Sequence, residues 1–246
     1  YQRGLSGQIE QRVVHAFLRL LAQEKPERIS LAAHAGYWKQ RTNAPGGDID
    51  VWSCNWNGAF DGLSYANVIQ DLSEMYPAVM FDTIDLSSAE RIQQQGKPGG
   101  FPIAGPLAEC DKAASVAALK TGGRIRVVLN LANIGTFFPL MPDEGFQQSF
   151  GGTGNLHEMI SAAFALKPAE FSIIGAIRGD DGGNGEESMR CNTILAGRDP
   201  VAVDAAGAVM MGMNPWDIEH FHYAAQSGLG TFDLDSMDVR GTELQN

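Results

Sequence analysis

Apolar residues recur every three to four positions along several stretches of the chain, which is the spacing of a helix with one buried face. In the first stretch they are Ile9, Val13, Phe17, Leu20 and Leu21. Several later stretches begin with Ser, Asn or Asp, whose side chains accept hydrogen bonds from the first free N–H groups of a helix. The predicted helices cover residues 9–21, 64–75, 87–95, 111–120, 155–166, 199–211 and 214–227.

Shorter runs between these helices, apolar or alternating with β-branched residues, predict strands. The predicted strands cover residues 29–33, 78–86, 125–131, 171–177 and 192–196. Because strands and helices alternate along the whole length, we expect the α/β class, with a mostly parallel sheet, helices on both faces and long loops at the strand carboxyl ends. No linker or repeat divides the sequence, so we expect a single domain over residues 1–246.

Ligands of such sheets bind beyond the carboxyl ends of the strands. The loops expected there cover residues 35–61, 132–154 and 178–187. His34 follows a predicted strand and His157 lies in the first turn of a predicted helix, so both are candidates to face the cleft. By contrast, Glu219 and His222 stand three apart on one helix, a pair that we interpret as surface residues.

The composition narrows the classes of partner and cofactor. The 246 residues carry a formal charge of −11 without a cluster of Lys and Arg, which argues against nucleic acid. Cys54, Cys110 and Cys191 form no Cys-x-x-Cys pair, so we expect no iron–sulfur cluster from this chain alone. Buried thiols favour a cytoplasmic location, although an exported form stays open because the chain starts at Tyr1. No apolar run approaches the ~20 residues of a transmembrane helix.

An acidic glycine-rich loop between residues 178 and 187 is the sharpest local feature. Its glycines let the backbone turn freely, and Asp180, Asp181 and Glu186 offer the oxygen ligands that divalent cations prefer. We therefore expect a divalent metal there, or a phosphate bridged by one. A solvated turn is the alternative, since the spacing is not that of an EF-hand.

Two aspartates stand out in the run from Leu195 to Ala205. Asp199 precedes Pro200 and is expected to cap the next helix, and it is also a candidate ligand-binding residue, like Asp204. Asp204 follows inside an apolar helix, where a carboxylate is costly unless it is paired. It would anchor Arg198, hold a strand-end loop or touch a ligand, and the first two alternatives are favoured.

A third group of candidate ligand-binding residues flanks the predicted strand at 125–131. Lys120 and Thr121 come just before it, and Asn133 and Gly135 just after it. Lys120 supplies a positive charge and Asn133 supplies amide groups for a small anionic ligand. The same amide would equally satisfy the backbone of the loop.

Together these segments resemble the uncharacterised family numbered 362 among the domains of unknown function. The run Leu-Ala-Gly-Arg-Asp-Pro-Val-Ala-Val-Asp-Ala at 195–205 carries most of the resemblance. The segments Leu-Lys-Thr at 119–121 and Asn-Leu-Ala-Asn-Ile-Gly at 130–135 are similar to two further family segments. The sequence departs from the family at Gly122, where a His is usual, and at Ala132, where a Lys is usual. The resemblance also implies a first strand that is missing before Tyr1, and a ferredoxin-like domain that this chain lacks.

These observations leave two hypotheses about function. The first is a protein that binds a small anionic molecule or a divalent metal at the sheet edge, with a redox-linked enzyme as one form of it. The second is a non-catalytic assembly or structural subunit derived from the family, which the departures at Gly122 and Ala132 favour. Under either hypothesis we expect a homo-oligomer or a subunit with a partner.

Overall fold

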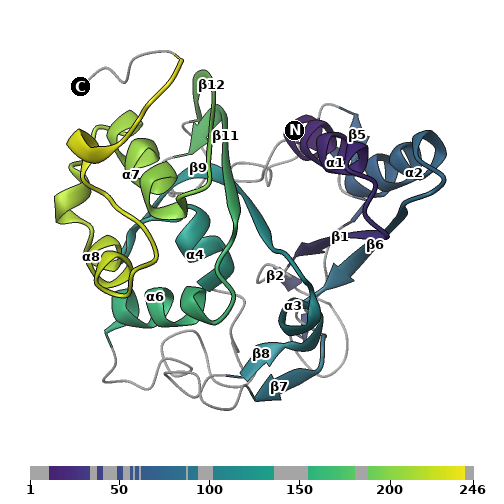
Figure 1. The fold of residues 1–246 in the computed structure, drawn as a ribbon, viewed down its shortest axis with the longest axis horizontal. Coiled ribbons are helices and arrows are strands. Elements are labelled where there is room, and N and C mark those ends of the chain that lie inside the picture. Colours follow the sequence, from purple (N-terminus) through teal and green to yellow (C-terminus); the bar gives the residue numbers. More distant parts are fainter. Residues whose placement is uncertain are drawn as a thin grey trace. The chain divides into compact units, whose positions relative to one another are not determined.

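The computed structural model describes most of the chain (Figure 1). The described residues are 11–33, 38–40, 49–51, 56–57, 59–60, 62–86, 88–93, 102–135, 155–180 and 188–241. They group into two compact units. The first unit contains residues 91–103 and 107–246, and the second contains residues 11–90 and 104–106. The prediction of a single domain stays a prediction.

The second unit is built on a parallel pair of strands joined through a helix. Strand β1 (Arg28–Ala33) lies beside β6 (Met80–Asp85), and α2 (Tyr65–Met75) packs on β6. Helix α1 (Gln11–Gln23) packs against α2 and buries Val13 and Phe17 of the predicted stripe. Leu20 of that stripe is instead 61% exposed, so this part of the prediction is wrong, and Ile9 lies outside the described residues. Ser64 begins α2 with a reciprocal capping box, in which it and Asn67 hydrogen-bond to each other's backbone N–H. Short antiparallel pairs complete this unit: β2 (Trp38–Gln40) with β3 (Ile49–Val51), and β4 (Ala59–Phe60) with β5 (Leu63–Ser64).

The first unit is built on a four-stranded sheet in the order β10-β9-β11-β12 (Figure 1). Its two central strands, β9 (Ala114–Gly122) and β11 (Phe171–Asp180), are parallel. The outer strands β10 (Arg126–Val127) and β12 (Ser188–Gly197) pair with them in antiparallel fashion. A further two-stranded pair is formed by β7 (Arg91–Gln93) and β8 (Pro102–Ala104), followed by α3 (Gly105–Glu109). The α/β class expected from the sequence is confirmed.

Helices cover the core face of this sheet. Helix α4 (Asn130–Gly135) contacts β9, and α7 (Pro200–Met210) contacts β11 and β12. Helices α6 (Leu156–Leu166) and α8 (Glu219–Gln226) pack on each other, α6 also on α4 and α8 also on α7. The short 3-10 helices η1 (Pro215–Asp217) and η2 (Leu234–Ser236) flank α8 in sequence. Fully buried side chains from the strands and helices form one continuous apolar core, among them Leu129, Ile174, Phe164 and Phe221.

The prediction of a helix over residues 111–120 is wrong, because residues 114–122 form the central strand β9. The Ala-rich composition favoured a helix by propensity. The burial pattern instead has a period of two, with Ser115, Ala117 and Leu119 buried and their neighbours less so. Small side chains suit a strand against which a helix packs closely, so tertiary packing overrides the propensity.

Three other predicted elements are also corrected. The strand expected over residues 125–131 is limited to Arg126–Val127, and Asn130 already begins α4. The helix expected over residues 87–95 contains the strand Arg91–Gln93. The last predicted helix, over residues 214–227, is divided at Ile218 into η1 and α8. The helices that begin after Asn155 and Asp199 are confirmed, because each has the capping hydrogen bond that its sequence predicts.

Within the described parts of the chain, no helix is both long enough and apolar enough to span a membrane.

Candidate ligand-binding edge of the sheet

Near the carboxyl ends of the two parallel strands, a cationic and an anionic residue occupy paired register positions. In the register of β9 and β11, Lys120 is paired with Asp180, one position after the pair of Leu119 and Gly179. A β-carbon on Gly207 of α7 would lie 3.6 Å from Leu119 Cδ1, so Leu119 faces the helix-covered core. Because successive side chains of a strand alternate, Lys120 projects to the opposite face, and its register partner Asp180 shares that face. Asp180 is nevertheless 9% exposed, which makes it a largely desolvated carboxylate.

A bulge in β11 lies directly before this edge. Gly175 pairs with Ala118 of β9, and the next paired residue of β11 is Gly179, which pairs with Leu119. The segment from Ala176 to Arg178 is therefore extra on β11, and the register with β12 also shifts there. Bulges occur preferentially beside active sites, because they redirect the end of a strand. Sequence reasoning missed this bulge, although the glycines on either side of it were a usable signal.

The remaining residues of the predicted ligand group are divided between two places. Thr121 follows Lys120 in β9 and pairs with Val127 of β10, so it belongs to the same edge. Asn133 lies elsewhere, because its Nδ2 donates to Ser115 Oγ at 3.1 Å and to the Val116 carbonyl at 3.3 Å. Those residues are at the start of β9, four to five positions before Lys120, or roughly 15 Å along the strand. Gly135 ends α4, the helix that carries Asn133. The structure therefore groups Lys120 and Thr121 with Asp180, and not with Asn133.

The predicted metal ligands are only partly within the described residues. Asp180 ends β11, whereas Asp181 and Glu186 lie outside the described residues. Over the described ranges, no group of three or more His, Cys, Asp or Glu side chains is arranged to hold a metal ion. Metal binding at this edge therefore stays a prediction.

Both carboxylate oxygens of Asp199 accept hydrogen bonds from backbone N–H groups. Oδ1 accepts a hydrogen bond from the Ala202 N–H at 2.9 Å, which is the expected helix cap. Oδ2 accepts one from the Thr231 N–H at 2.9 Å, in the segment that follows α8. Gly230 packs so tightly on this carboxylate that a β-carbon there would lie 2.0 Å from Oδ1. Asp199 therefore joins the start of α7 to the C-terminal segment.

Asp204 holds the start of a second helix. Its Oδ1 accepts hydrogen bonds from the backbone N–H and the Nδ2 of Asn130, and its Oδ2 accepts one from the Leu131 N–H, all at 2.8–2.9 Å. The side chain is fully buried, and burial raises the pKa of its carboxyl group to about 7, while the three donors act to lower it. Of the three expected roles, the structure shows the anchoring of the segment that follows a strand, with Asn130 as the anchor point rather than Arg198.

A pair of histidines joins α6 to α8. His157 Nδ1 lies 3.1 Å from His220 Nδ1, whereas the ring centroids are 5.4 Å apart, so the two nitrogens lie between the rings and face each other. His220 is fully buried and its Nε2 has no hydrogen-bond partner. Burial, with a smaller effect of His157, lowers the pKa of His220 to about 3. Sequence reasoning missed this pair, because the two residues are 63 positions apart.

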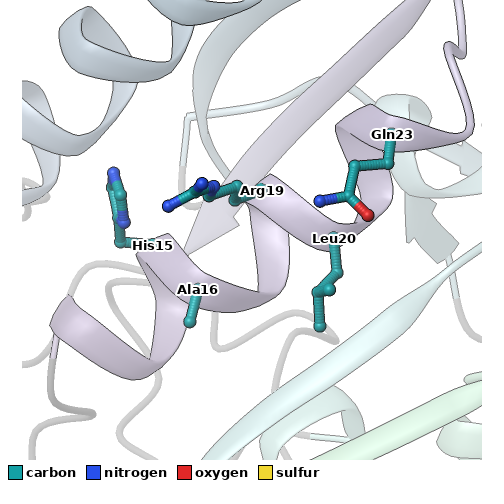
Figure 2. A pocket seen from close by; sticks show the side chains of 5 residues that line it. All are labelled: His15, Ala16, Arg19, Leu20 and Gln23. Atoms are coloured by element: carbon teal, nitrogen blue, oxygen red, sulfur yellow. The ribbon is translucent and has the colours of Figure 1, made fainter.

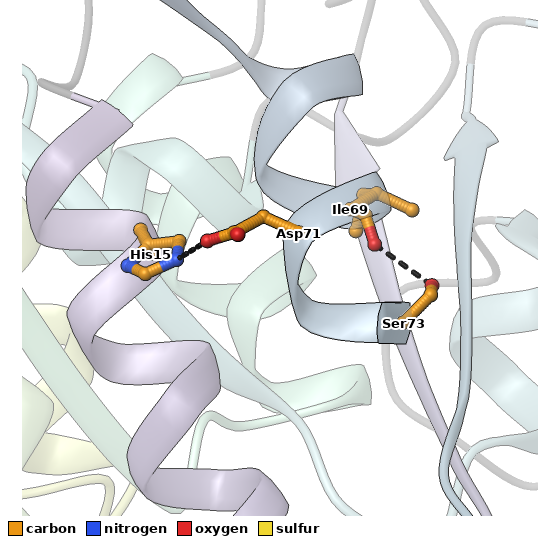
Figure 3. Close-up of polar contacts among 4 residues, drawn as sticks. All are labelled: His15, Ile69, Asp71 and Ser73. Atoms are coloured by element: carbon orange, nitrogen blue, oxygen red, sulfur yellow. Dashed lines mark hydrogen bonds and ion pairs between the residues drawn. The ribbon is translucent and has the colours of Figure 1, made fainter. Parts of the chain in front are cut away.

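The second unit has a shallow hollow along the outside of α1 (Figure 2). Its volume is about 350 Å³, and it is lined by His15, Ala16, Arg19, Leu20 and Gln23. His15 Nε2 also lies 2.7 Å from Asp71 Oδ2 of α2, which joins the two helices (Figure 3). A hollow formed by one stripe of a single helix lacks the converging polar groups of a ligand site. We therefore do not place the site here.

The fold and the sheet edge together define an α/β protein in which Lys120 and Asp180 occupy paired register positions near the carboxyl ends of the parallel central strands. Residues 12–209 match the family described as "Domain of unknown function (DUF362)". Because this match covers most of the chain, the protein belongs to that family, as the sequence motifs indicated. No curated protein and no solved structure matched the chain.

Proposed function

We propose that this protein binds a small anionic molecule at the carboxyl ends of β9 and β11, directly or through a divalent cation. The observation that carries the proposal is the register pairing of Lys120 with Asp180. An ammonium group offers three hydrogen-bond donors and a full charge to an anion. The carboxylate of Asp180, at the paired position of the neighbouring strand, is of the type that binds a hard cation such as Mg²⁺.

Two features support this position over others in the fold. Ligands of open α/β sheets bind beyond the carboxyl ends of the strands, and β9 and β11 are the parallel pair of this sheet. The β11 bulge from Ala176 to Arg178 also redirects the strand just before Asp180. By contrast, Asp199 and Asp204 already use their carboxylates to hold backbone N–H groups, so we assign neither to a ligand.

The proposal is tested with inorganic phosphate as the anion, with and without Mg²⁺, by isothermal titration calorimetry. In the Lys120→Met variant we expect the affinity for phosphate to fall at least about tenfold, because one charge-assisted hydrogen bond contributes about 1.5–3 kcal/mol. Asp180→Asn should reduce only the part of the affinity that Mg²⁺ adds.

Lys112→Met is the matched control, because Lys112 is exposed and forms a surface ion pair with Glu170 at 2.8 Å. It should bind phosphate as the wild type does. Equal phosphate binding by Lys120→Met and the wild type would contradict the proposal, as would an equal loss in both lysine variants.

A second function, assembly with another protein chain, is favoured by a separate observation. Edge strand β12 carries Met189 and Ile194, which are 63% and 54% exposed. Large apolar side chains on an edge strand are typical of interaction surfaces.

A further inference from the structure

The contact between α6 and α8 contains two titratable residues, His157 and His220, and the buried Nε2 of His220 has no hydrogen-bond partner. A hydrogen bond between two facing Nδ1 atoms requires one ring to donate an N–H and the other to accept it through a lone pair. His157 and His220 therefore hold α8 on α6 only while at least one Nδ1 is unprotonated. Protonation of both rings would place two N–H groups and two positive charges 3.1 Å apart.

From this geometry we propose that the His157–His220 pair is an acid-sensitive latch, which keeps α8 docked on α6 near neutral pH and releases it as the pH falls. His220 is the sensitive member because its ring is fully buried. Its Nε2 has no hydrogen-bond partner, so the docked position offers no compensation for a second proton. Release brings the ring into water, where it binds that proton freely.

Other contacts between the two helices do not replace the latch. Asn155 Nδ2 donates to Glu219 Oε2 at 3.2 Å and to the Tyr223 hydroxyl at 3.0 Å, but these groups are exposed. Ser161 Oγ donates to the His220 carbonyl at 2.8 Å, and this bond does not titrate. The release of α8 therefore depends on the histidine pair more than on these bonds.

The charged groups around the pair come from four elements. Helix α6 adds Glu158 beside His157, and η1 contributes Asp217. Helix α8 adds the residues Glu219, His222 and Tyr223. Helix α4 has no ionisable side chain, and α7 has Asp204 alone, whose carboxylate is bonded to Asn130 and Leu131.

Because Asp204 is buried, its carboxyl group favours the proton in the folded state, so acid does not release α7 from α4. Acid should therefore release α8 while the rest of the unit stays folded.

The test is amide hydrogen exchange of the full chain at pH 7 and pH 5, with protection factors corrected for the intrinsic rates. We expect the protection factors of the α8 amides to be about 20-fold lower at pH 5 than at pH 7. The released state, with His220 in water, binds a proton that the docked state does not, so the equilibrium shifts toward release by up to tenfold per pH unit. Protection of α7 amides should not fall, because the buried Asp204 carboxyl group favours the proton in the folded state. The His220→Leu variant should lose the pH dependence in α8, and His222→Gln, on the same helix, should keep it.

A second measurement does not depend on any variant. The ¹⁵N shifts of the histidine rings report the protonation of each ring, and His220 should stay neutral at pH 5 in the folded protein. A His220 ring that is already charged at pH 5 in the folded protein would overturn the proposal. Equal loss of protection in α7 and α8, or no loss in α8, would overturn it too.

Discussion

At the scale of single residues, two buried ionisable groups of the first unit respond to pH in opposite directions. His220 has a pKa of about 3 in the folded protein against an ordinary 6.5, so the unfolded chain binds the extra proton and stability falls as the pH falls between these values. Asp204 has a pKa of about 7 against an ordinary 3.8, so the folded chain binds the extra proton and stability falls as the pH rises. The two effects oppose each other over most of the same range.

Single substitutions should separate these two effects. The stability difference between the wild type and His220→Leu should shrink as the pH falls from 6.5 toward about 4, by at most about 1.4 kcal/mol per pH unit. The difference between the wild type and Asp204→Asn should shrink as the pH rises over the same range. Urea unfolding of the three proteins at a series of pH values measures both slopes. Parallel curves for all three proteins would show that neither group titrates abnormally.

Several residue-level expectations were accessible from sequence, and the reason differs from case to case. The capping roles of Asn155 and Asp199 were predictable, because a cap depends on neighbours within three positions. The partner of Asp204 was not, because Asn130 is 74 positions away. The sequence showed only that a buried carboxylate needs partners.

At the scale of elements, the segment after α8 is fixed by one glycine. Gly230 has a φ of +151°, and a β-carbon at this position would lie 2.0 Å from Asp199 Oδ1. The carboxylate cannot move away without losing its bonds to Ala202 and Thr231. Gly230 therefore allows the segment after α8 to approach the Asp199 side chain closely.

Gly230→Ala should therefore destabilise the protein by at least about 2 kcal/mol, because overpacking and backbone strain act together. Urea unfolding measures the change, and limited proteolysis should cut first between residues 228 and 241. Gly123→Ala is the control, since a β-carbon there has no atom within 4 Å. A Gly230→Ala variant as stable as this control would show that the segment tolerates displacement.

The elements also show where local sequence patterns stop being informative. The helix over residues 155–166 was predicted to within a residue, because its cap and its period agree. Strand β9 was mistaken for a helix, because alanine propensity and tertiary packing disagree there. The same error affects the candidate site, since Lys120 was expected before a strand and in fact lies near the carboxyl end of β9, which ends at Gly122. Its pairing with Asp180 depends on a register that no local pattern encodes.

At the scale of the whole molecule, the sequence predicts that the chain forms a homo-oligomer or binds a partner subunit. The exposed apolar side chains Met189 and Ile194 lie on an edge strand whose described partner is β11 alone. Substitutions on this strand therefore test that prediction most directly.

We expect the wild type to sediment as a dimer or larger assembly, and the double variant Met189→Ser, Ile194→Ser to shift toward the monomer at the same concentration. Sedimentation velocity gives the result, and Val239→Ser, which alters another exposed apolar residue, is the control. A monomeric wild type, or an assembly equally stable in the double variant, would remove β12 from consideration as an interface.

The bond between Asp199 and Thr231 also has a consequence for how the family should be delimited. The shared sequence pattern ends at residue 209, within α7. Yet Phe221 and Phe232, both beyond that boundary, belong to the same buried core as Ile174. A chain cut at the edge of the recognisable pattern would lose part of its own interior. The folded core is thus longer than the matched family segment, and comparisons among relatives should extend at least through Phe232.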